Sequence, residues 1–300
     1  MKKKTYLFAL MAMVLTLGSC SDNENGIGGE TSKYITVSTS IGNMTRVATD
    51  EKGGQTFEEG DEISVYAWTG DATIAPDASE RVVNNAINKL TNGSWVSTPQ
   101  MLWKNNRDKH YFIGVYPTAA ISDLSAGEYT FDANKQTESD LLVAVNPDGL
   151  SYSADAQQTV PLTFTHVMAK LAVNLTYKNQ WGGIPTVEKV VVGNAAKEAT
   201  INYLTKVVTP STTAKEDFSL PEITENTKYV SVIIPQEDVK QLTIVIGGKN
   251  FVYDNGTPFK LESGKITTFN LEVGRDEIKL GDVKITDWEN GSTFSGEALN

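Results

Sequence analysis

The chain has 300 residues, of which 40% are hydrophobic and 21% charged, and its 26 basic and 37 acidic residues give a net charge of −11. This length suits two domains of average size, and this composition excludes disorder along the whole chain. An acidic chain without a basic cluster is atypical of nucleic-acid binders. One cysteine and two histidines leave little for a disulfide framework or a metal site. We therefore expect no nucleic acid, metal or cofactor.

The first twenty residues are typical of a bacterial targeting signal. Three lysines precede an uncharged stretch, Tyr6 to Leu17, which is too short to span a bilayer as a helix but suits the apolar region of a signal peptide. Leu17-Gly18-Ser19-Cys20 follows and resembles a lipobox, whose cysteine is lipidated and becomes the first mature residue. We predict a signal peptide at 1–19 with lipidation of Cys20. The alternative is an ordinary signal peptide in which this cysteine stands by chance.

The polar, acidic and glycine-rich residues after Cys20 indicate a flexible tether, so residues 20–33 are predicted to be a lipidated linker. An acidic stretch directly after the lipidated cysteine also resembles the surface-export signal of Bacteroidales lipoproteins. We therefore expect the protein on the cell outer membrane, facing outward.

From Tyr34 onward the sequence alternates with period two and is rich in β-branched and aromatic residues, which predicts strands. Tyr34–Ile41 places Ile35, Val37, Thr39 and Ile41 on one face. Asn92-Gly93 predicts a tight hairpin. Ala78–Leu90 comes nearest to a helical period and is a candidate short helix. The other strands predicted in this half are 62–68, 87–91, 94–96, 111–116, 129–132 and 141–145.

The second half continues the pattern, and Gly247-Gly248 marks another hairpin. Many short strands at close spacing favour an all-β fold of antiparallel sandwiches. Small and polar residues at 149–161 indicate a domain boundary, which gives an N-terminal domain at 34–160 and a C-terminal domain at 161–300. The strands predicted in this half are 171–177, 187–192, 200–204, 229–234, 242–246, 250–253, 266–273 and 282–288.

No motif of a hydrolase, metalloprotease or nucleotide-binding protein is present, and we predict no catalytic residue. A pair of glycosidase carboxylates stays open because their separation is spatial. His110 is expected in a polar loop at 104–109, and His166 is expected to pack at a strand end near the domain junction. The acidic run Glu58–Glu62 favours a solvated turn over a calcium site.

Several short sequence motifs follow one another in a recognisable order along the chain. They are Thr45-Arg46, Phe57–Trp68, Leu102-Trp103, Tyr111–Pro117, Asp140–Ala144, Phe164–Leu171, Ser263–Leu271 and Ile285–Gly291. Together with the lipobox, this series resembles the fimbrillin-like lipoproteins of the Bacteroidales, the subunits of type V pili. The resemblance implies two tandem transthyretin-like antiparallel β-sandwich domains after the signal peptide, delivery to the outer membrane, and assembly into a filament after proteolysis.

The resemblance also implies a cut after an arginine near the start of the first domain. Arg46 stands between the alternating Tyr34–Ile41 segment and a polar loop, where a trypsin-like protease can reach it. We predict cleavage between Arg46 and Val47, which would release the first strand. The alternative is that Arg46 is an ordinary exposed arginine.

The C-terminal region carries a candidate donor strand for a neighbouring subunit. Ile278 and Leu280 alternate with polar residues, and the phase then shifts at Gly281 so that Val283 and Ile285 alternate in turn. This pattern predicts two short strands joined by a bend, lying in the open groove of another subunit. The alternative is that the region completes its own sandwich.

The leading hypothesis is a structural fimbrial subunit that polymerises with other pilin subunits by donor-strand exchange and serves adhesion to host or bacterial surfaces. The alternative is a monomeric cell-surface lipoprotein that binds a glycan or a host protein. The resemblance does not distinguish a shaft, anchor or tip subunit.

Overall fold

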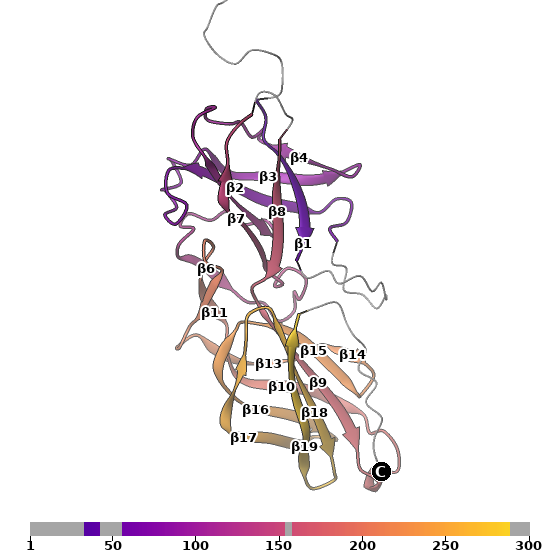
Figure 1. The fold of residues 1–300 in the computed structure, drawn as a ribbon. Coiled ribbons are helices and arrows are strands. Elements are labelled where there is room, and N and C mark those ends of the chain that lie inside the picture. Colours follow the sequence, from indigo (N-terminus) through magenta and orange to yellow (C-terminus); the bar gives the residue numbers. More distant parts are fainter. Residues whose placement is uncertain (1–32, 43–55, 154–157, 289–300) are drawn as a thin grey trace, which may run out of the picture. The chain divides into compact units, whose positions relative to one another are not determined.

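A computed structural model describes residues 33–42, 56–153 and 158–288, all of which belong to one compact unit, Thr31–Asn300. These residues form nineteen strands and a single short 3₁₀ helix, Asn179–Trp181 (Figure 1). The predicted all-β class is therefore confirmed.

The N-terminal strands form a seven-stranded sheet in the order β1-β8-β7-β5-β2-β3-β4. The central strand β2 is buried along almost its whole length, because side chains on both of its faces pack inside the fold. Asn92 and Gly93 have φ values of 51° and 73°, which confirms the predicted hairpin between β3 and β4. The strands are β1 (Thr36–Ile41), β2 (Glu62–Thr69), β3 (Val83–Thr91), β4 (Ser94–Thr98), β5 (His110–Tyr116), β7 (Leu142–Leu150) and β8 (Thr159–His166).

The candidate short helix at Ala78–Leu90 is wrong, because most of this segment is strand β3. A bulge explains the misleading period. Val65 and Ala67 of β2 pair with Ala86 and Val83 of β3, so β3 contains one extra residue, and Asn85 has a φ of 57°. The extra residue shifts the alternation by one position and gives apolar residues a spacing of three and four, as in a helix.

The remaining strands form three sheets, in the orders β13-β10-β16-β17, β14-β15-β9-β18-β19 and β12-β11-β6. Gly247 and Gly248, with φ values of 58° and 72°, turn β16 into β17 as predicted. The strands are β6 (Gly127–Thr130), β9 (Ala169–Tyr177), β10 (Val187–Ala196), β11 (Glu198–Asn202), β12 (Val207–Pro210), β13 (Lys215–Ser219), β14 (Glu222–Thr224), β15 (Lys228–Ile233), β16 (Gln236–Ile246), β17 (Lys249–Leu261), β18 (Lys265–Val273) and β19 (Ile278–Asp287).

Most strand pairs are antiparallel, but β1 pairs with β8 and β9 pairs with β18 in parallel. The expectation of purely antiparallel sheets is corrected at these two pairs. Hairpin signals predict antiparallel pairing only between strands that follow each other closely. Each parallel pair joins strands far apart in the sequence, for which no local signal exists.

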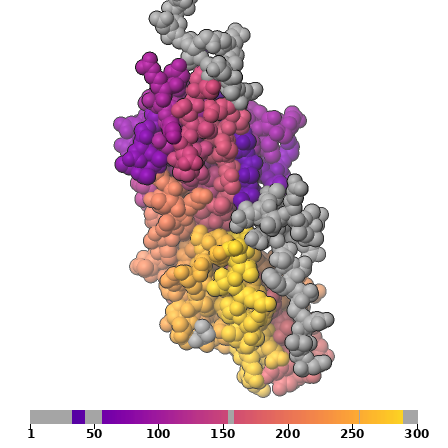
Figure 2. Space-filling model, in the orientation of Figure 1, coloured from indigo at the N-terminus to yellow at the C-terminus, as the bar shows by residue number. Residues whose placement is uncertain are grey.

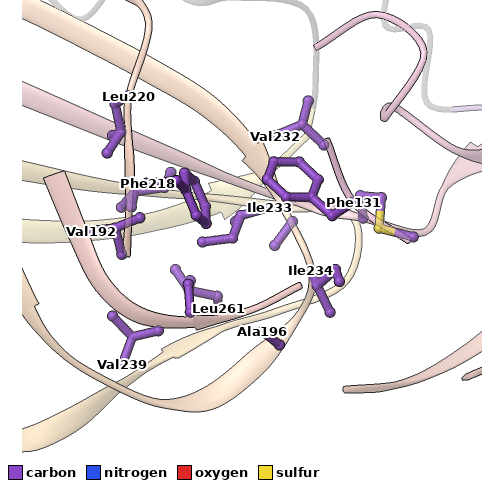
Figure 3. Packing of buried hydrophobic residues seen from close by; sticks show 14 of the residues in the cluster. Phe131, Val192, Ala196, Phe218, Leu220, Val232, Ile233, Ile234, Val239 and Leu261 are labelled. Carbon is purple, nitrogen blue, oxygen red and sulfur yellow. The ribbon is translucent and has the colours of Figure 1, made fainter. Parts of the chain in front are cut away.

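The hydrophobic core draws on residues from both sides of the predicted boundary. Phe131 packs 5.1 Å from Phe218, within the cluster that contains Val232, Ile234 and Leu261 (Figure 3). Strand β6 likewise pairs with β11. Strand β8 continues the first sheet to His166, and β9 begins the next at Ala169. The division into domains at 34–160 and 161–300 stays a prediction.

Candidate functional site

Strand β1 lies in a slot that has β8 along one edge, and the residues just before β1 have backbone partners on the other edge. On one edge β1 pairs with β8 from Thr36 opposite Thr159 to Ile41 opposite Phe164. On the other edge, the Ile35 amide donates to the Met101 carbonyl (3.0 Å) and the Trp103 amide donates to the Lys33 carbonyl (3.1 Å). In the space-filling view β1, in indigo, is a narrow strip between β8 and the purple surface of the early strands (Figure 2).

The inner face of β1 is buried as its alternation predicts. Ile35, Val37 and Ile41 are 1%, 6% and 8% exposed. Burying three such side chains contributes roughly 5–9 kcal/mol as an upper value, which is comparable to the whole stability of an ordinary domain. The N-terminal fold therefore depends on a strand that precedes Arg46.

Strand β8 relies on β1 for much of its pairing. Strand β7 pairs with β8 only from Phe164 to His166, so among the described residues Thr159–Thr163 have β1 as their strand partner. Amide groups of successive residues in a strand point to opposite edges. The Phe164 carbonyl accepts from Gly42 on the β1 side. The nitrogen of Pro161 therefore lies on the edge away from β1.

One polar side chain stands on the inner face of β1. Thr39 lies on the same face as Val37 and Ile41, and its Oγ1 accepts a hydrogen bond from the indole Nε1 of Trp95 (3.0 Å). Trp95 belongs to β4, which closes the slot on the side opposite β8. The alternation of β1 places Thr39 inward, but no sequence signal pairs it with Trp95, because the two residues are 56 positions apart.

An aromatic cluster lies beside the slot. The Phe57 ring makes edge-on contacts with the rings of Trp95, Tyr116 and Phe164, at centroid distances of 5.3, 5.4 and 5.1 Å. Phe57 is the second described residue after 43–55, and these contacts hold its ring beside the slot. The sequence analysis placed Phe57 in the motif Phe57–Trp68 but predicted no contact between Phe57 and this slot.

The predicted donor region forms one continuous strand, β19, at the edge of the five-stranded sheet. The phase shift at Gly281 is confirmed as a bulge, because Asn270 pairs with Asp282 while the next residue of β18, Leu271, pairs with Leu280. The predicted division into two short strands is wrong. A single extra residue is absorbed within the ladder and does not interrupt it.

The four candidate donor residues form an apolar stripe along β19. They stand opposite the inward-facing residues of β18, with Val283 paired to Phe269 and Leu280 to Leu271. Leu280, Val283 and Ile285 are nevertheless 38%, 40% and 48% exposed. In the described chain β19 completes its own sheet and leaves this stripe, which begins at Ile278, half uncovered.

The end of β19 is held by an aromatic stack. The Trp288 ring lies parallel to the His166 ring at 4.0 Å, and the Lys170 ammonium lies 4.7 Å from the centre of the indole. His166 Nδ1 is 2.8 Å from Asp140 Oδ1, which fixes the imidazole. Burial lowers the pKa of Lys170. The predicted position of His166 at a strand end is confirmed, since it is the last residue of β8.

His110 is the first residue of β5 and is fully buried, so its predicted place in a polar loop is wrong. The Lys104 amide donates to Nε2 (3.0 Å), and Nδ1 therefore carries the proton and donates to the Asp108 carbonyl (3.1 Å). The polar run at 104–109 folds back over the imidazole and supplies both partners. Burial lowers the pKa of His110.

The acidic run is an exposed turn, as predicted. Gly60 has a φ of 97°, and the Asp61 carboxylate accepts from the Glu58 amide (2.7 Å). Within residues 33–42, 56–153 and 158–288, no group of three or more His, Cys, Asp or Glu side chains is placed to hold a metal ion. The same part of the chain contains no helix long and apolar enough to cross a membrane. Cys20, Arg46 and Val47 lie outside the described residues.

Comparisons of the sequence with known proteins identify a family and a relative. A family model described as fimbrillin-like matches residues 45–288. A Bacteroides uniformis protein named as a fimbrium subunit, Fim1C, is 24% identical over 99% of this chain and 100% of its own length.

Solved structures share the fold. A crystal structure from Bacteroides uniformis titled as a cell adhesion protein has a TM-score of 0.64 and 20% identity, covering 86% of this chain and 100% of that one. A Bacteroides ovatus structure with a similar title has a TM-score of 0.63 and 18% identity, covering 86% and 99%. The tip fimbrial protein Mfa3 of Porphyromonas gingivalis, with a C-terminal truncation, has a TM-score of 0.50 and 11% identity, covering 85% and 99%.

Proposed function

The chain belongs to the fimbrillin-like family, and from this premise we propose that it is a fimbrial subunit that reaches the outer membrane as a lipoprotein and polymerises by strand exchange. It is a structural protein and not an enzyme. Its partners are other pilin subunits, and the appendage they build on the cell surface serves adhesion, in keeping with two structural neighbours that are named as cell adhesion proteins.

The observation that carries this proposal is the position of β1. This strand is buried on its inner face and pairs with β8 on one edge, and the residues just before it pair with residues 101–103 on the other edge. It nevertheless precedes the proposed cut between Arg46 and Val47. Cleavage there would separate β1 from the rest of the chain. The slot it vacates would present apolar walls and the unpaired edge of β8, which together form a site for an added strand.

Strand β19 of another copy is the proposed occupant. It stands at a sheet edge, and its stripe of Ile278, Leu280, Val283 and Ile285 is only half buried in its own sheet. Transfer into the slot would cover Val283 and Ile285 of this stripe and restore the strand partner of β8.

The lipid on Cys20 belongs to the stage before assembly. It would tether the precursor to the outer membrane, and cleavage after Arg46 would remove the tether together with β1. Anchoring, processing and polymerisation are thereby coupled through one cut. Replacing Cys20 with Ala should shift the precursor from the detergent phase to the aqueous phase in phase partitioning; retention in the detergent phase would contradict lipidation at this residue.

The test compares wild type with Arg46→Ala in the organism that carries the protein, with the exposed Arg107→Ala as the matched control. We expect wild type and Arg107→Ala to begin at Val47 and to give ladders of SDS-resistant oligomers. Arg46→Ala should retain its start at Cys20 and remain a monomer. Ladders of equal strength in all three strains would contradict the proposal. A cut chain that stays monomeric would favour the alternative, a surface protein that binds a glycan or host protein.

A further inference from the structure

The slot of β1 contains a hydrogen-bond donor that stays in place when β1 leaves. The indole Nε1 of Trp95 donates to Thr39 Oγ1 (3.0 Å), and Thr39 stands between the buried side chains of Val37 and Ile41. The slot is therefore apolar at three inward positions of the strand and polar at one. A strand that fills the slot must therefore place apolar side chains at three inward positions and a polar side chain at the remaining one.

Trp95 is held by parts of the chain that follow the proposed cut. It pairs with Leu90 across the β3–β4 hairpin, and its ring packs edge-on against Phe57 at 5.3 Å. Its acceptor, Thr39, precedes the cut. Cleavage would therefore remove the acceptor and leave the donor positioned.

An incoming strand must satisfy this donor. While the slot is open, water can accept the indole proton. Once a strand covers it, an inward side chain without an acceptor leaves this part-buried N–H unpaired, which is costly. Sites that hydrogen-bond a ligand discriminate strongly against analogues that lack the partner. For the β1 sequence, a shift of two residues in either direction would place Val37 or Ile41 at Trp95, and that register would be disfavoured.

We propose that Trp95 sets the register of strand exchange by requiring a side-chain acceptor two residues after a pair of alternating apolar residues. The occupant it selects is β19 of a second copy. Val283, Ile285 and Asp287 repeat the spacing of Ile35, Val37 and Thr39. The carboxylate of Asp287, which is paired with Lys265 in its own sheet, would accept the indole proton. This inference rests on the proposed function.

The first test measures strand binding directly. The full chain is given a specific protease site within 43–55, cut, and refolded with labelled peptides in place of the released strand. Peptide 33–42 should bind, and its Thr39→Ser variant should bind nearly as well because it keeps the hydroxyl. Its Thr39→Val variant, with the same shape and no acceptor, should bind about tenfold more weakly.

The control is the same measurement in a Trp95→Phe chain, where the difference between the wild-type peptide and its Thr39→Val variant should disappear. A loss that persists in Trp95→Phe, or no loss in the wild-type slot, overturns the role of Trp95.

For peptide 276–288, Asp287→Ala should weaken binding about tenfold. The Asp282→Ala variant of this peptide is the control and should bind as the unmodified peptide does, because Asp282 lies on the outward face in this alignment. If the Asp287→Ala and Asp282→Ala peptides bind equally well, the alignment of Asp287 with Thr39 is wrong.

A failure of strand exchange can be distinguished from a failure of the proposed role of Trp95. If neither peptide binds the cut chain, the proposed function fails, and the uncut chain still tests Trp95. In the uncut chain, Thr39→Val should lower the folding equilibrium constant about tenfold, but should have little effect in a Trp95→Phe background. Additive effects of the two substitutions would overturn the inference.

Discussion

His110 is buried as a neutral imidazole because backbone groups occupy both of its ring nitrogens. A proton added to Nε2 would have to displace the amide of Lys104 in a desolvated site. The sequence showed only a polar run followed by a histidine, which is why it favoured an exposed loop. Burial comes from Trp103, which packs edge-on against the imidazole at 5.0 Å, and this contact depends on the tertiary fold.

We predict a specific loss of stability in mild acid. Because the pKa of His110 is lower in the folded state than its unfolded value of about 6.5, the unfolded state binds the proton more strongly, and the free energy of unfolding falls as the pH drops below about 6.5. Its slope is at most about 1.4 kcal/mol per pH unit. His110→Gln should show a shallower slope between pH 6.5 and 5 in denaturant titrations. Val115→Ala, a buried change without a titrating group, should keep the wild-type slope; equal slopes in all three chains would contradict the assignment.

Trp288 is predicted to control how firmly β19 is held in its own sheet. Trp288→Ala removes the stack on His166 and the contact with Lys170. Truncation of a buried Trp costs roughly 3–5 kcal/mol. Hydrogen exchange should therefore accelerate in β19 and change little in the seven-stranded sheet. Lys284→Ala, on the same strand and exposed, is the matched control. Unchanged protection of β19 in Trp288→Ala would show that the stack does not hold the strand.

At the scale of elements, local alternation predicted most strands well, and it placed β1 and β19 with their apolar faces. It failed in β3, where a bulge gives the residues a helical spacing. It also failed for β1 against β8, since no signal joins two strands separated by more than a hundred residues. The slot itself could not be predicted from the sequence for the same reason. Its walls come from β4, β8 and residues 101–103, which only the tertiary fold brings together.

Pro161 illustrates how one residue limits Thr159–Thr163 of β8 to pairing on the β1 edge. Pro161 has no N–H to offer on the side away from β1, which limits strand addition there. Pro161→Thr should change the free energy of unfolding of the uncut chain by less than about 1 kcal/mol. After the cut, the variant should form SDS-sensitive aggregates that light scattering detects, while wild type does not. Equal scattering from both cut chains would mean that Pro161 does not protect this edge.

At the scale of the whole molecule, residues from the two halves of the sequence contact each other, and the amino-acid composition does not predict these contacts. Gln136, from the first half, accepts a hydrogen bond from the amide of Val232 (2.6 Å) and contacts Ser231. Phe131 enters the same core. The sequence indicated a domain boundary at its polar segment 149–161, but it contained no sign of these contacts. Within the described residues, the core therefore joins elements from both halves of the sequence.

The central claim is that β19 of one copy occupies the β1 slot of another. Thr36 Oγ1 lies 3.2 Å from Thr159 Oγ1 on the outer face, and in the proposed alignment Lys284 takes the place of Thr36. The measurement mixes two cut chains, one with Lys284→Cys and one with Thr159→Cys, both in a Cys20→Ala background, under mild oxidation. We predict a disulfide-linked pair that requires the cut and is not formed when Thr163→Cys replaces Thr159→Cys. No linkage after the cut, or equal linkage in uncut chains, would contradict strand exchange through this slot.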